Sequence, residues 1–496
     1  MGIKDKRLGG VSLDAILLAF IKLVTAILGL ATTRLLSEYL TVYDYGTYSQ
    51  ILLIVSTVAL VTIFGMMDGM NYFYCRESDI QKKESYTATI FTVQLVFGTL
   101  AGCVVILLTA PLCAYFDNPD LKGLLIFAAV LPTLQNLLWI LQVLIVSNGG
   151  ARKLAVRNFV VSLSRLAAVI CIATFIKSIA FYLAVTVFLD IAQIIFFNIM
   201  LRKNKCYIKP SRVDFKLLGE IFKYCTPMAI FIIVNALNRD LDKYVVSMMT
   251  DTETLAMYAN ASKQLPFDIL VSSFATVLVP HIIRLISDKD SIETSKLCKL
   301  FFEVAYVTTS IPCFAALAAA PQLMKLLYSN KYTGVISIFC VYIIVDLVRF
   351  TNQTFILSSA GRSKWLMLLG IGALSVNTAL NVILYHFMGL IGPAVATLIV
   401  TALSGAIMLR LDAKVLKMRI CELFDLKYLL VFSVESVILA VALSFFAHQL
   451  DKWDVHYFVI LVLVGGAYCA TLFLLNFRRL FVNLKKINGI SKKTRV

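Results

Sequence analysis

The chain has 496 residues, of which 60% are hydrophobic and only 15% are charged, and its formal net charge is +17. Soluble chains carry about 25% charged residues, so this composition excludes a soluble globular protein or a disordered one. Apolar runs of about 18 or more residues are typical of transmembrane helices, and such runs fill the sequence. We therefore predict an all-α polytopic membrane protein with about fourteen transmembrane helices.

The predicted helices follow one another with short connections, none of them long enough to form a separate soluble domain. The first apolar run is not a cleavable signal peptide, because it is long, contains Lys22 and has no small-residue cleavage site. In chain order, the predicted spans lie near residues 11–33, 47–74, 86–110, 123–147, 158–176, 179–200, 224–249, 264–283, 300–320, 334–358, 365–385, 390–409, 428–448 and 457–476.

The basic residues concentrate on one side of these spans. With the N-terminus inside, the inner segments contain 34 Lys and Arg residues and the outer segments contain seven. This asymmetry follows the positive-inside rule, so we predict that both termini and the loop 201–223 are cytoplasmic. Because the positive charge is explained by topology, it does not require a nucleic-acid partner.

Neither a metal site nor an active site is predicted. The 11 Cys are scattered without a CxxC pair, and the four His form no cluster with ligand spacing. The sequence contains no phosphate-binding loop of the GxxxxGK[ST] type and no nucleophile–base pair. We therefore expect a protein that is not an enzyme and that has no cofactor.

Two pairs of segments indicate an internal repeat. EYLTVYDYGTYS (38–49) aligns with DTETLAMYANAS (251–262) at an offset of 213, which places Tyr45 on Tyr258. NGGARK (148–153) aligns with SAGRSK (359–364) at an offset of 211. The agreement of the two offsets favours duplication over chance similarity of turns, and parallel repeats are common among transporters, with the binding site between them.

The predicted repeat divides the chain into three parts. Residues 1–204 form an N-terminal lobe with helices 1–6, and residues 205–412 form a C-terminal lobe with helices 7–12. Residues 413–496 contain two additional helices and a basic cytoplasmic tail. We expect the two six-helix lobes to be pseudo-symmetric about an axis along the membrane normal.

Charged residues inside the predicted helices are candidates for function, because a charge at the centre of the bilayer costs about 2.5–3.5 kcal/mol and needs a cavity or a partner. Five cations lie within predicted helices, namely Lys22, Arg165, Arg239, Lys243 and Arg349. Lys22 and Arg165 have no acid three or four residues away, so each requires an acid from another helix, a water-filled cavity or an anionic ligand.

Other charges have local partners. Helical spacing predicts the ion pairs Arg239–Asp242 and Asp240–Lys243 within NRDLDK (238–243), and also Asp346–Arg349. Arg34 lies at the outer end of helix 1, where Glu38 follows four residues later and the side chain can snorkel to the interface. At these positions structural pairing remains open beside substrate binding.

Two stripes of neutral polar residues lie on helices 11 and 12. Asn377 and Asn381 are four residues apart, as are Thr397 and Thr401. Hydrogen bonding between helices is the usual role of such residues in membranes, and an ion site is the alternative.

Segments distributed over nearly the whole chain resemble the polysaccharide-export flippases of the multidrug/oligosaccharidyl-lipid/polysaccharide exporter superfamily. The order and spacing of the motifs carry the resemblance more than any one of them. The segments are RLLSEYLTVYDYGTYS (34–49), DFKLLGEIFKYCTPM (214–228), NRDLDKYVVSMMTDTETLAMYANAS (238–262), APQLMKLLYSNKY (320–332) and NTALNVILYHFMGLIGPAVAT (377–397).

This resemblance implies transport of undecaprenyl-diphosphate-linked oligosaccharide units from the cytoplasmic to the outer leaflet of a bacterial inner membrane, for O-antigen, capsule or exopolysaccharide assembly. It also implies two V-shaped lobes around a central cationic cavity. The expected partners are the lipid-linked oligosaccharide, membrane lipids, and the polymerase and chain-length machinery. The residues expected to neutralise the diphosphate are Lys22, Arg34, Arg165, Arg239, Lys243 and Arg349.

Related peptidoglycan-precursor flippases hold sodium on helices 7, 11 and 12, which makes Na⁺ or H⁺ the candidate coupling ion here. The corresponding residues are Asn238, Asn377, Asn381 and Thr397, with Asp240 as a substitute acid. Amides stand where the family has carboxylates, so this set offers less negative charge to a cation.

Two other functions fit a helical membrane protein of this size. A cation-coupled multidrug exporter of the same superfamily usually has twelve helices and needs an acidic cavity, whereas cations are in excess here. A membrane scaffold without transport activity, within a polysaccharide assembly complex, gives no reason for isolated charges in the hydrocarbon.

Overall fold

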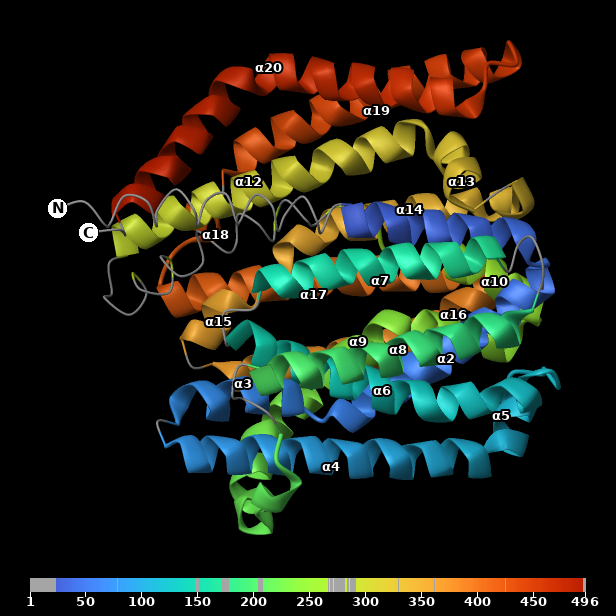
Figure 1. Ribbon diagram of the computed structural model, residues 1–496. Helices are drawn as coiled ribbons and strands as arrows, with labels where there is room; N and C mark the ends of the chain where they lie inside the picture. Colours follow the sequence, from blue (N-terminus) through green and yellow to red (C-terminus); the bar gives the residue numbers. More distant parts are fainter. Residues whose placement is uncertain are drawn as a thin grey trace. The chain divides into compact units, whose positions relative to one another are not determined.

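A computed structural model describes residues 24–77, 79–147, 151–171, 178–203, 208–265, 291–328, 330–360, 362–423 and 425–493, together with 267, 271, 282 and 285. All regular secondary structure in these ranges is helical, which confirms the all-α class (Figure 1). Among these residues, nine segments are long and apolar enough to cross a membrane, and one of them, Lys364–Leu416, contains two helices. Phe215–Pro227 and Ile232–Met249, which meet at 45°, form a further broken span.

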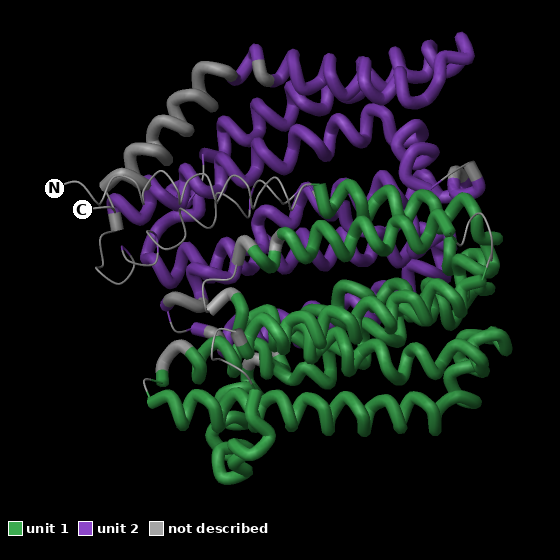
Figure 2. Tube along the Cα trace, in the orientation of Figure 1, with its two compact units in different colours: residues 1–256 green, residues 257–496 purple. Residues whose placement is uncertain are grey.

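The chain folds into two compact units, residues 1–256 and 257–496 (Figure 2). The helices of each unit satisfy their own backbone hydrogen bonds, which is the requirement that a bilayer imposes on any spanning segment. The lobes 1–204 and 205–412 remain a prediction, since the division at residue 256 reflects packing and not the internal repeat.

Unit 1 is built around α6, which packs against α2, α3, α4 and α8, while α9 packs on α2 and α3. A buried cluster that includes Met66, Met70, Ile140 and Leu144 fills the space between these helices. The elements of unit 1 are a helix over 24–39, α2 Val42–Ile63, α3 Met66–Arg76, α4 Ile80–Leu107, α5 Thr109–Tyr115, α6 Leu121–Ser147, α7 Ala151–Cys171, α8 Ile179–Lys203, η2 Pro210–Arg212, η3 Phe215–Leu217 and α9 Leu218–Met249; α10, Thr252–Ala261, begins in unit 1 and ends in unit 2.

A break separates α2 from α3. Phe64 and Gly65 both have left-handed backbone angles, with φ of 43° and 67°. A side chain on Gly65 would also meet the backbone oxygen of Cys225, 2.8 Å from an ideal Cβ, on α9. Glycine therefore meets two needs here, a positive φ and the close approach of another helix.

In unit 2, α12 packs against α14, α19 and α20, and α17 packs against α14 and α16. Its core contains Phe301, Phe302, Phe432 and Tyr468, all nearly fully buried. The elements are α12 Ser291–Ala318, α13 Ala320–Tyr328, η4 Asn330–Val335, α14 Ile336–Val348, η5 Arg349–Thr351, α15 Phe355–Ser359, α16 Ser363–Met388, η6 Gly389–Ile391, α17 Gly392–Leu416, α18 Ile420–Leu423, α19 Leu426–Lys452 and α20 Tyr457–Lys493.

The helix bounds repeat with nearly the spacing that the sequence predicts. Both ends of α12 follow those of α4 at an offset of 211, the start of α16 follows that of α7 at 212, and both ends of α17 follow those of α8 at 213. A short helix follows the long one in both halves, α5 after α4 and α13 after α12. The order and length of the elements therefore support the internal repeat, and superposition of the lobes remains its test.

The register differs at the start of α2 and α10. Thr41 caps α2 by accepting a hydrogen bond from the Asp44 amide, and Asp251 caps α10 by accepting one from the Thr254 amide. The offset between these two caps is 210, which is three fewer than in the alignment of Tyr45 with Tyr258. A shift of three residues is close to one helical turn, so it keeps the same helix face.

Several helices extend beyond their predicted limits into charged sequence, and α7 and α17 are two of them. Helix α7 begins at Ala151 and not near residue 158, and α17 continues to Leu416 and not only to 409. Hydropathy places the end of a span where charges begin, but the hydrogen-bonded helix continues past that point. As a result Arg157 and Asp412, expected in loops, both lie within helices.

Candidate functional site

Four side chains on α7 and α8 form a connected polar group within unit 1, here named the α7–α8 charge cluster: Arg157, Arg165, Asp190 and Gln193. Arg165 donates through Nη2 to Oδ1 of Asp190 at 3.2 Å. Gln193, one turn further along α8, donates to the same Oδ1 at 3.0 Å. The partner that Arg165 needs is thus an acid from another helix, one of the alternatives that the sequence leaves open.

Arg157 extends the cluster by two helical turns. It donates through Nη2 to Oε1 of Gln193 and through Nη1 to Oδ1 of Asn158 at 2.6 Å. Its guanidinium also lies 4.7 Å from the ring centroid of the buried Phe197, within the range of a cation–π interaction. The sequence analysis missed Arg157 because it was assigned to a loop; its spacing of eight residues from Arg165, about two turns, was the available signal.

The cluster contains two cations and one acid. Asp190 is 1% exposed and Arg165 is 38% exposed, so the acid is enclosed while one cation reaches the surface of the unit. The Nε atoms of Arg157 and Arg165 and Oδ2 of Asp190 have no hydrogen-bond partner among the described residues. One positive charge is therefore in excess, while the two unpaired Nε donors are themselves buried.

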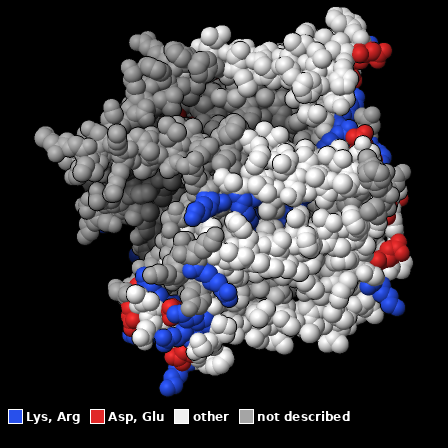
Figure 3. Space-filling view, viewed as in Figure 1, with Lys and Arg blue, Asp and Glu red and all other residues white. Residues whose placement is uncertain are grey.

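Positive charge over α7 is also visible on the surface of the protein (Figure 3). On the face drawn in Figure 3, charged side chains gather mainly at the two ends of the helices. A group of basic side chains interrupts the uncharged surface between these ends, over α7. Charge is costly in the hydrocarbon, so a basic group away from the ends of the helices needs an explanation.

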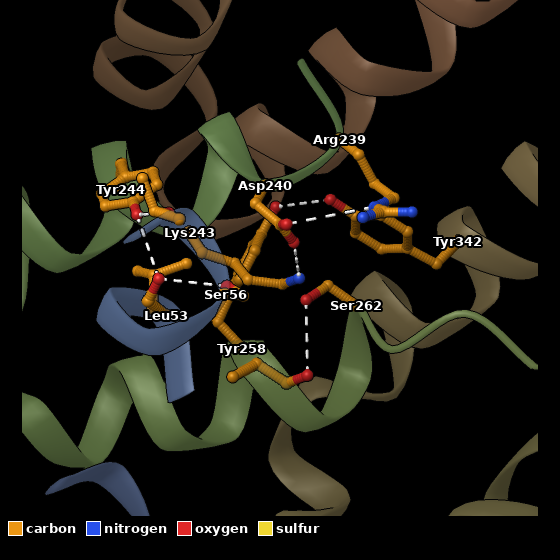
Figure 4. Close-up of polar contacts among 11 residues, drawn as sticks. Leu53, Ser56, Arg239, Asp240, Lys243, Tyr244, Tyr258, Ser262 and Tyr342 are labelled. Atoms are coloured by element: carbon orange, nitrogen blue, oxygen red, sulfur yellow. Dashed lines mark hydrogen bonds and ion pairs between the residues drawn. The ribbon is translucent and has the colours of Figure 1, made fainter. Parts of the chain in front are cut away.

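The second group of charges lies on α9, in the NRDLDK segment (Figure 4). Lys243 donates to Asp240 at 2.6 Å, which is the predicted pair. The predicted pairing of Arg239 with Asp242 is wrong, because Arg239 forms its ion pair with Asp240 at 3.9 Å. Arg239 is 58% exposed and Asp242 is 1% exposed, so their side chains leave α9 in different directions. Asn238 precedes this group on the same helix.

The outermost predicted cation is Arg34, on the helix over 24–39. It forms the expected ion pair with Glu38, at 2.8 Å, and is 22% exposed. Lys22, the most isolated cation in the sequence, lies outside the described residues.

Unit 2 contains one of the predicted cations, Arg349, at the end of α14. It donates to Oδ1 of Asp346 at 2.9 Å, as the spacing predicts. The other oxygen of Asp346 accepts from the Leu265 amide at 3.3 Å. This acid therefore has two structural partners, and removing the Asp346–Arg349 pair together leaves one amide to satisfy.

Three of the predicted neutral polar residues of α16 and α17 are buried, and Thr401 is partly exposed. Asn377 and Asn381 are 1% and 0% exposed, and Thr397 is 5% exposed. Asn381 donates to the carbonyl and to the side-chain oxygen of Asn377, at 2.7 and 2.9 Å. Oδ1 of Asn381 and Oγ1 of Thr397 have no hydrogen-bond partner among the described residues. Oxygen atoms of this kind are ligands for a hard monovalent cation.

A groove of about 630 Å³ lies within unit 1 between α2, α4, α5 and α9. Its lining is mainly aliphatic, with hydroxyls from Thr57, Thr62, Tyr115 and Tyr244. None of the predicted cations lines it, so the groove differs from the cationic cavity that the sequence predicts. That cavity remains a prediction.

Comparison with known proteins assigns the chain to a family. The model of a family described as polysaccharide biosynthesis protein matches residues 33–337, more than half of the chain. None of the curated proteins matches the chain significantly by sequence.

Solved structures with the same fold are those of a flippase and of transporters. The lipid II flippase MurJ, in an inward closed conformation, has 17% identity and a TM-score of 0.73, over 94% of this chain and 100% of that one. A multidrug resistance MATE transporter of the MOP superfamily, inward-facing, has 12% identity and a TM-score of 0.68, over 80% and 98%. A MOP superfamily transporter from Pyrococcus furiosus, whose binding pocket is described as having reverse polarity, has 11% identity and a TM-score of 0.61, over 81% and 94%.

Proposed function

The chain belongs to the polysaccharide biosynthesis protein family, and we propose that it is a flippase for undecaprenyl-diphosphate-linked oligosaccharide units. It moves these units from the cytoplasmic to the outer leaflet of the bacterial inner membrane by alternating access. Its termini are cytoplasmic, and its partners are the lipid-linked oligosaccharide and the polymerase and chain-length machinery. The product is used for O-antigen, capsule or exopolysaccharide.

The observation that carries this proposal is the excess positive charge of the α7–α8 charge cluster. Arg157 and Arg165 share one buried acid, Asp190, and keep unused donors. A guanidinium binds phosphate through several parallel hydrogen bonds, so two of them suit a diphosphate better than a drug cation. The other proposed substrate residues are Lys22, Arg34, Arg239, Lys243 and Arg349, each of which adds positive charge.

The membrane potential supplies a driving force in the required direction. With the inside negative, moving two negative charges outward releases roughly 4–5 kcal/mol at 100 mV, since each charge contributes about 2.3 kcal/mol. Coupling to Na⁺ through the oxygen atoms of Asn377, Asn381 and Thr397, or to H⁺ through the carboxylate of Asp240 on α9, which lies near Asn238 on that helix, adds to this driving force. The lobes 1–204 and 205–412 are the bodies that move.

The test is transport in proteoliposomes that contain a polyprenyl-diphosphate oligosaccharide with a fluorescent sugar. We expect the wild type to expose the sugar on the opposite leaflet, where a membrane-impermeant quencher reads it. Arg157→Gln should slow this step about tenfold or more, because a hydrogen bond to a charged group contributes about 1.5–3 kcal/mol.

The matched control removes a cation that has no place in the cluster. Lys296 is 65% exposed and pairs with Glu293 at 2.9 Å on the surface of α12, so Lys296→Gln should transport at the wild-type rate. A wild-type protein that carries a cationic dye and leaves the lipid-linked sugar in place would instead support the multidrug exporter.

A further inference from the structure

A second buried acid, Asp412, lies on α17 in unit 2, four residues before the helix ends at Leu416. Its side chain is 0% exposed, and neither Oδ1 nor Oδ2 has a hydrogen-bond partner among the described residues. It differs in this respect from Asp190 and Asp346, which both pair with arginine. A fully enclosed carboxyl group without any partner requires an explanation of its own.

The helices that pack on α18, together with α18 itself, bury apolar side chains. Leu297 and Phe301 of α12, Leu409 and Ala413 of α17, and Leu423 of α18 belong to one buried cluster. Helix α18 packs on both α12 and α17 and covers the end of the unit where α12 begins and α17 ends. We name this region the α12–α17 junction, defined by Leu297, Cys298, Phe301, Leu409, Asp412 and Leu423.

Among the titratable side chains described here, Cys298 is one whose thiol interacts electrostatically with the Asp412 carboxyl. It is 0% exposed on α12 and lies within electrostatic range of the carboxylate. It is a free thiol, so it offers a native chemical reporter beside the acid.

The charged groups named here, on elements around α17, form no ion pair with Asp412 among the described residues. Glu422 of α18 accepts from the Arg419 amide at 2.8 Å, and Arg349 of η5 pairs with Asp346. On α12, Lys296 pairs with Glu293, while Lys299 is only partly exposed; on α16, Lys364 is exposed.

An ionised carboxylate is not stable in such a place, because its desolvation is not offset by a cation or by hydrogen bonds. A metal cation does not solve the problem, since Na⁺ needs several oxygen ligands and the junction supplies aliphatic and aromatic side chains. A proton does, because it neutralises the carboxyl without further ligands.

We propose that Asp412 is a proton-binding site, and that the bound proton keeps the α12–α17 junction closed. When the proton leaves, the carboxylate must reach water, so α18 and the ends of α12 and α17 separate. The closed junction binds one more proton than the open one, and a rise in pH therefore favours opening. This inference rests on the proposed transport function, to which it adds the proton as the coupled ion.

The experiment uses a full-length protein in lipid nanodiscs that keeps Cys298 and has its other ten cysteines replaced. The rate of Cys298 modification by a maleimide is measured from about pH 5 to about pH 9, the range in which buried carboxyls titrate. The same rates are measured for Asp412→Asn, which imitates the neutral carboxyl at nearly the same volume. Both proteins share the thiol chemistry, so the ratio of their rates isolates Asp412.

We expect the ratio of wild-type to Asp412→Asn rates to rise with pH, by up to about tenfold per pH unit for one linked proton. A direct electrostatic effect has the opposite sign, because a carboxylate beside Cys298 disfavours the reactive thiolate and lowers the ratio. A ratio that stays flat or falls as the pH rises would overturn the proposal.

Two further measurements keep the outcome specific. Asp412→Glu, which still titrates, should retain the pH-dependent rate. The second uses a protein that keeps Cys313, which is 0% exposed further along α12, in place of Cys298. There the substitution Asp412→Asn should leave the maleimide rate unchanged across the same pH range.

A transport measurement on Asp412→Asn distinguishes failure of this inference from failure of the proposed function. Asp412→Asn should lower the rate of lipid-linked oligosaccharide transport at least about tenfold, because the closed junction no longer responds to pH, and normal transport would overturn the coupling. Failure of the proposed function looks different: the wild type itself moves no lipid-linked sugar, while the Cys298 rates still depend on pH.

Discussion

In the predicted internal repeat, helices α7 and α8 correspond to α16 and α17, but the polar side chains that they bury differ in charge. At the offset of 212 between the starts of α7 and α16, Arg165 corresponds to Asn377. At the offset of 213 between α8 and α17, Asp190 corresponds to Leu403. One helix pair thus contains an ion pair between its helices, and the other contains amides and a hydroxyl.

The difference indicates that the two halves share a frame and divide the chemistry. A positive charge in the membrane must be held by a buried acid until an anion arrives, which is the arrangement of Arg165 and Asp190. Neutral oxygen atoms need no such partner and can remain unpaired at a smaller cost, as at Asn381 and Thr397. On the proposed function, the first helix pair suits the anionic substrate and the second offers neutral oxygen atoms to a coupling cation.

The largest effect is expected from removing the charge of the first pair. Arg165→Gln leaves Asp190 buried without its cation, which should lower the free energy of unfolding by about 3–5 kcal/mol. It should also abolish export of polysaccharide in a cell that lacks its own flippase. Thermal unfolding in detergent and the amount of surface polymer measure the two consequences separately.

The double variant Arg165→Gln with Asp190→Asn separates stability from transport. The two neutral side chains can hydrogen-bond, so the melting temperature should recover most of the loss, whereas export should remain absent because no cation meets the diphosphate. Normal export by this variant would show that the pair is only structural. Asp346→Asn with Arg349→Gln is the matched pair in unit 2, and it should retain part of the export.

An intermediate effect is expected in the second pair. Thr397→Val removes an oxygen that has no hydrogen-bond partner among the described residues, so stability should stay the same or rise slightly. If Oγ1 is a ligand of the coupling ion, export should fall about tenfold, which corresponds to about 1.4 kcal/mol. Thr401→Val, one turn along the same helix, is the control and should export normally. Equal export from both variants contradicts a role for Thr397 in ion binding.

The smallest effect is expected where the repeat differs at the helix caps. Hydrogen bonds from the Thr254 side chain and amide lower the pKa of Asp251, whereas the corresponding cap of α2, Thr41, does not titrate in this range. Because its folded-state pKa is lowered, the Asp251 cap contributes fully above the ordinary value of about 3.9 and is lost as the pH falls through the lowered one.

Amide hydrogen exchange measures this cap directly. Protection of the Thr254 amide should decrease below about pH 4, and the Asp44 amide at the Thr41 cap serves as the internal reference. Asp251→Asn should remove the pH dependence while keeping most of the protection. A parallel decrease at both amides would point to general unfolding and not to the cap.

Most of the fold was predictable because the bilayer imposes one requirement on every span. Length and hydropathy place α6, α8 and α19 close to their predicted limits, whereas α20 begins as predicted but continues to Lys493. The repeat remains a prediction, based on turns with Tyr, Gly and Ser that recur at nearly the same distance. Ion pairs within one helix, such as Asp346–Arg349, followed from spacing alone.

The partners between helices were less accessible to sequence reasoning. Arg165 and Asp190 are 25 residues apart, and no local pattern links them. Arg157 and Asp412 were missed for a common physical reason: hydropathy assigns charged helix ends to loops, although the helical backbone extends through them. Arg239 pairs with its neighbour Asp240 because the side chain of Asp242 is directed into the core.

The ion pair between α7 and α8 also affects how the chain enters the bilayer during synthesis. Helix α7 has four cations in its 21 residues, whereas Ile179–Arg202 is apolar enough to cross a membrane. Each arginine near the centre of a span opposes insertion by about 2.5–3.5 kcal/mol. We therefore expect α7 to enter the bilayer only after α8, which contains Asp190, has been synthesised. We expect the two helices to insert as one hairpin: a nascent chain that ends before α8 should leave α7 accessible to water-soluble reagents, and a chain that includes α8 should protect it.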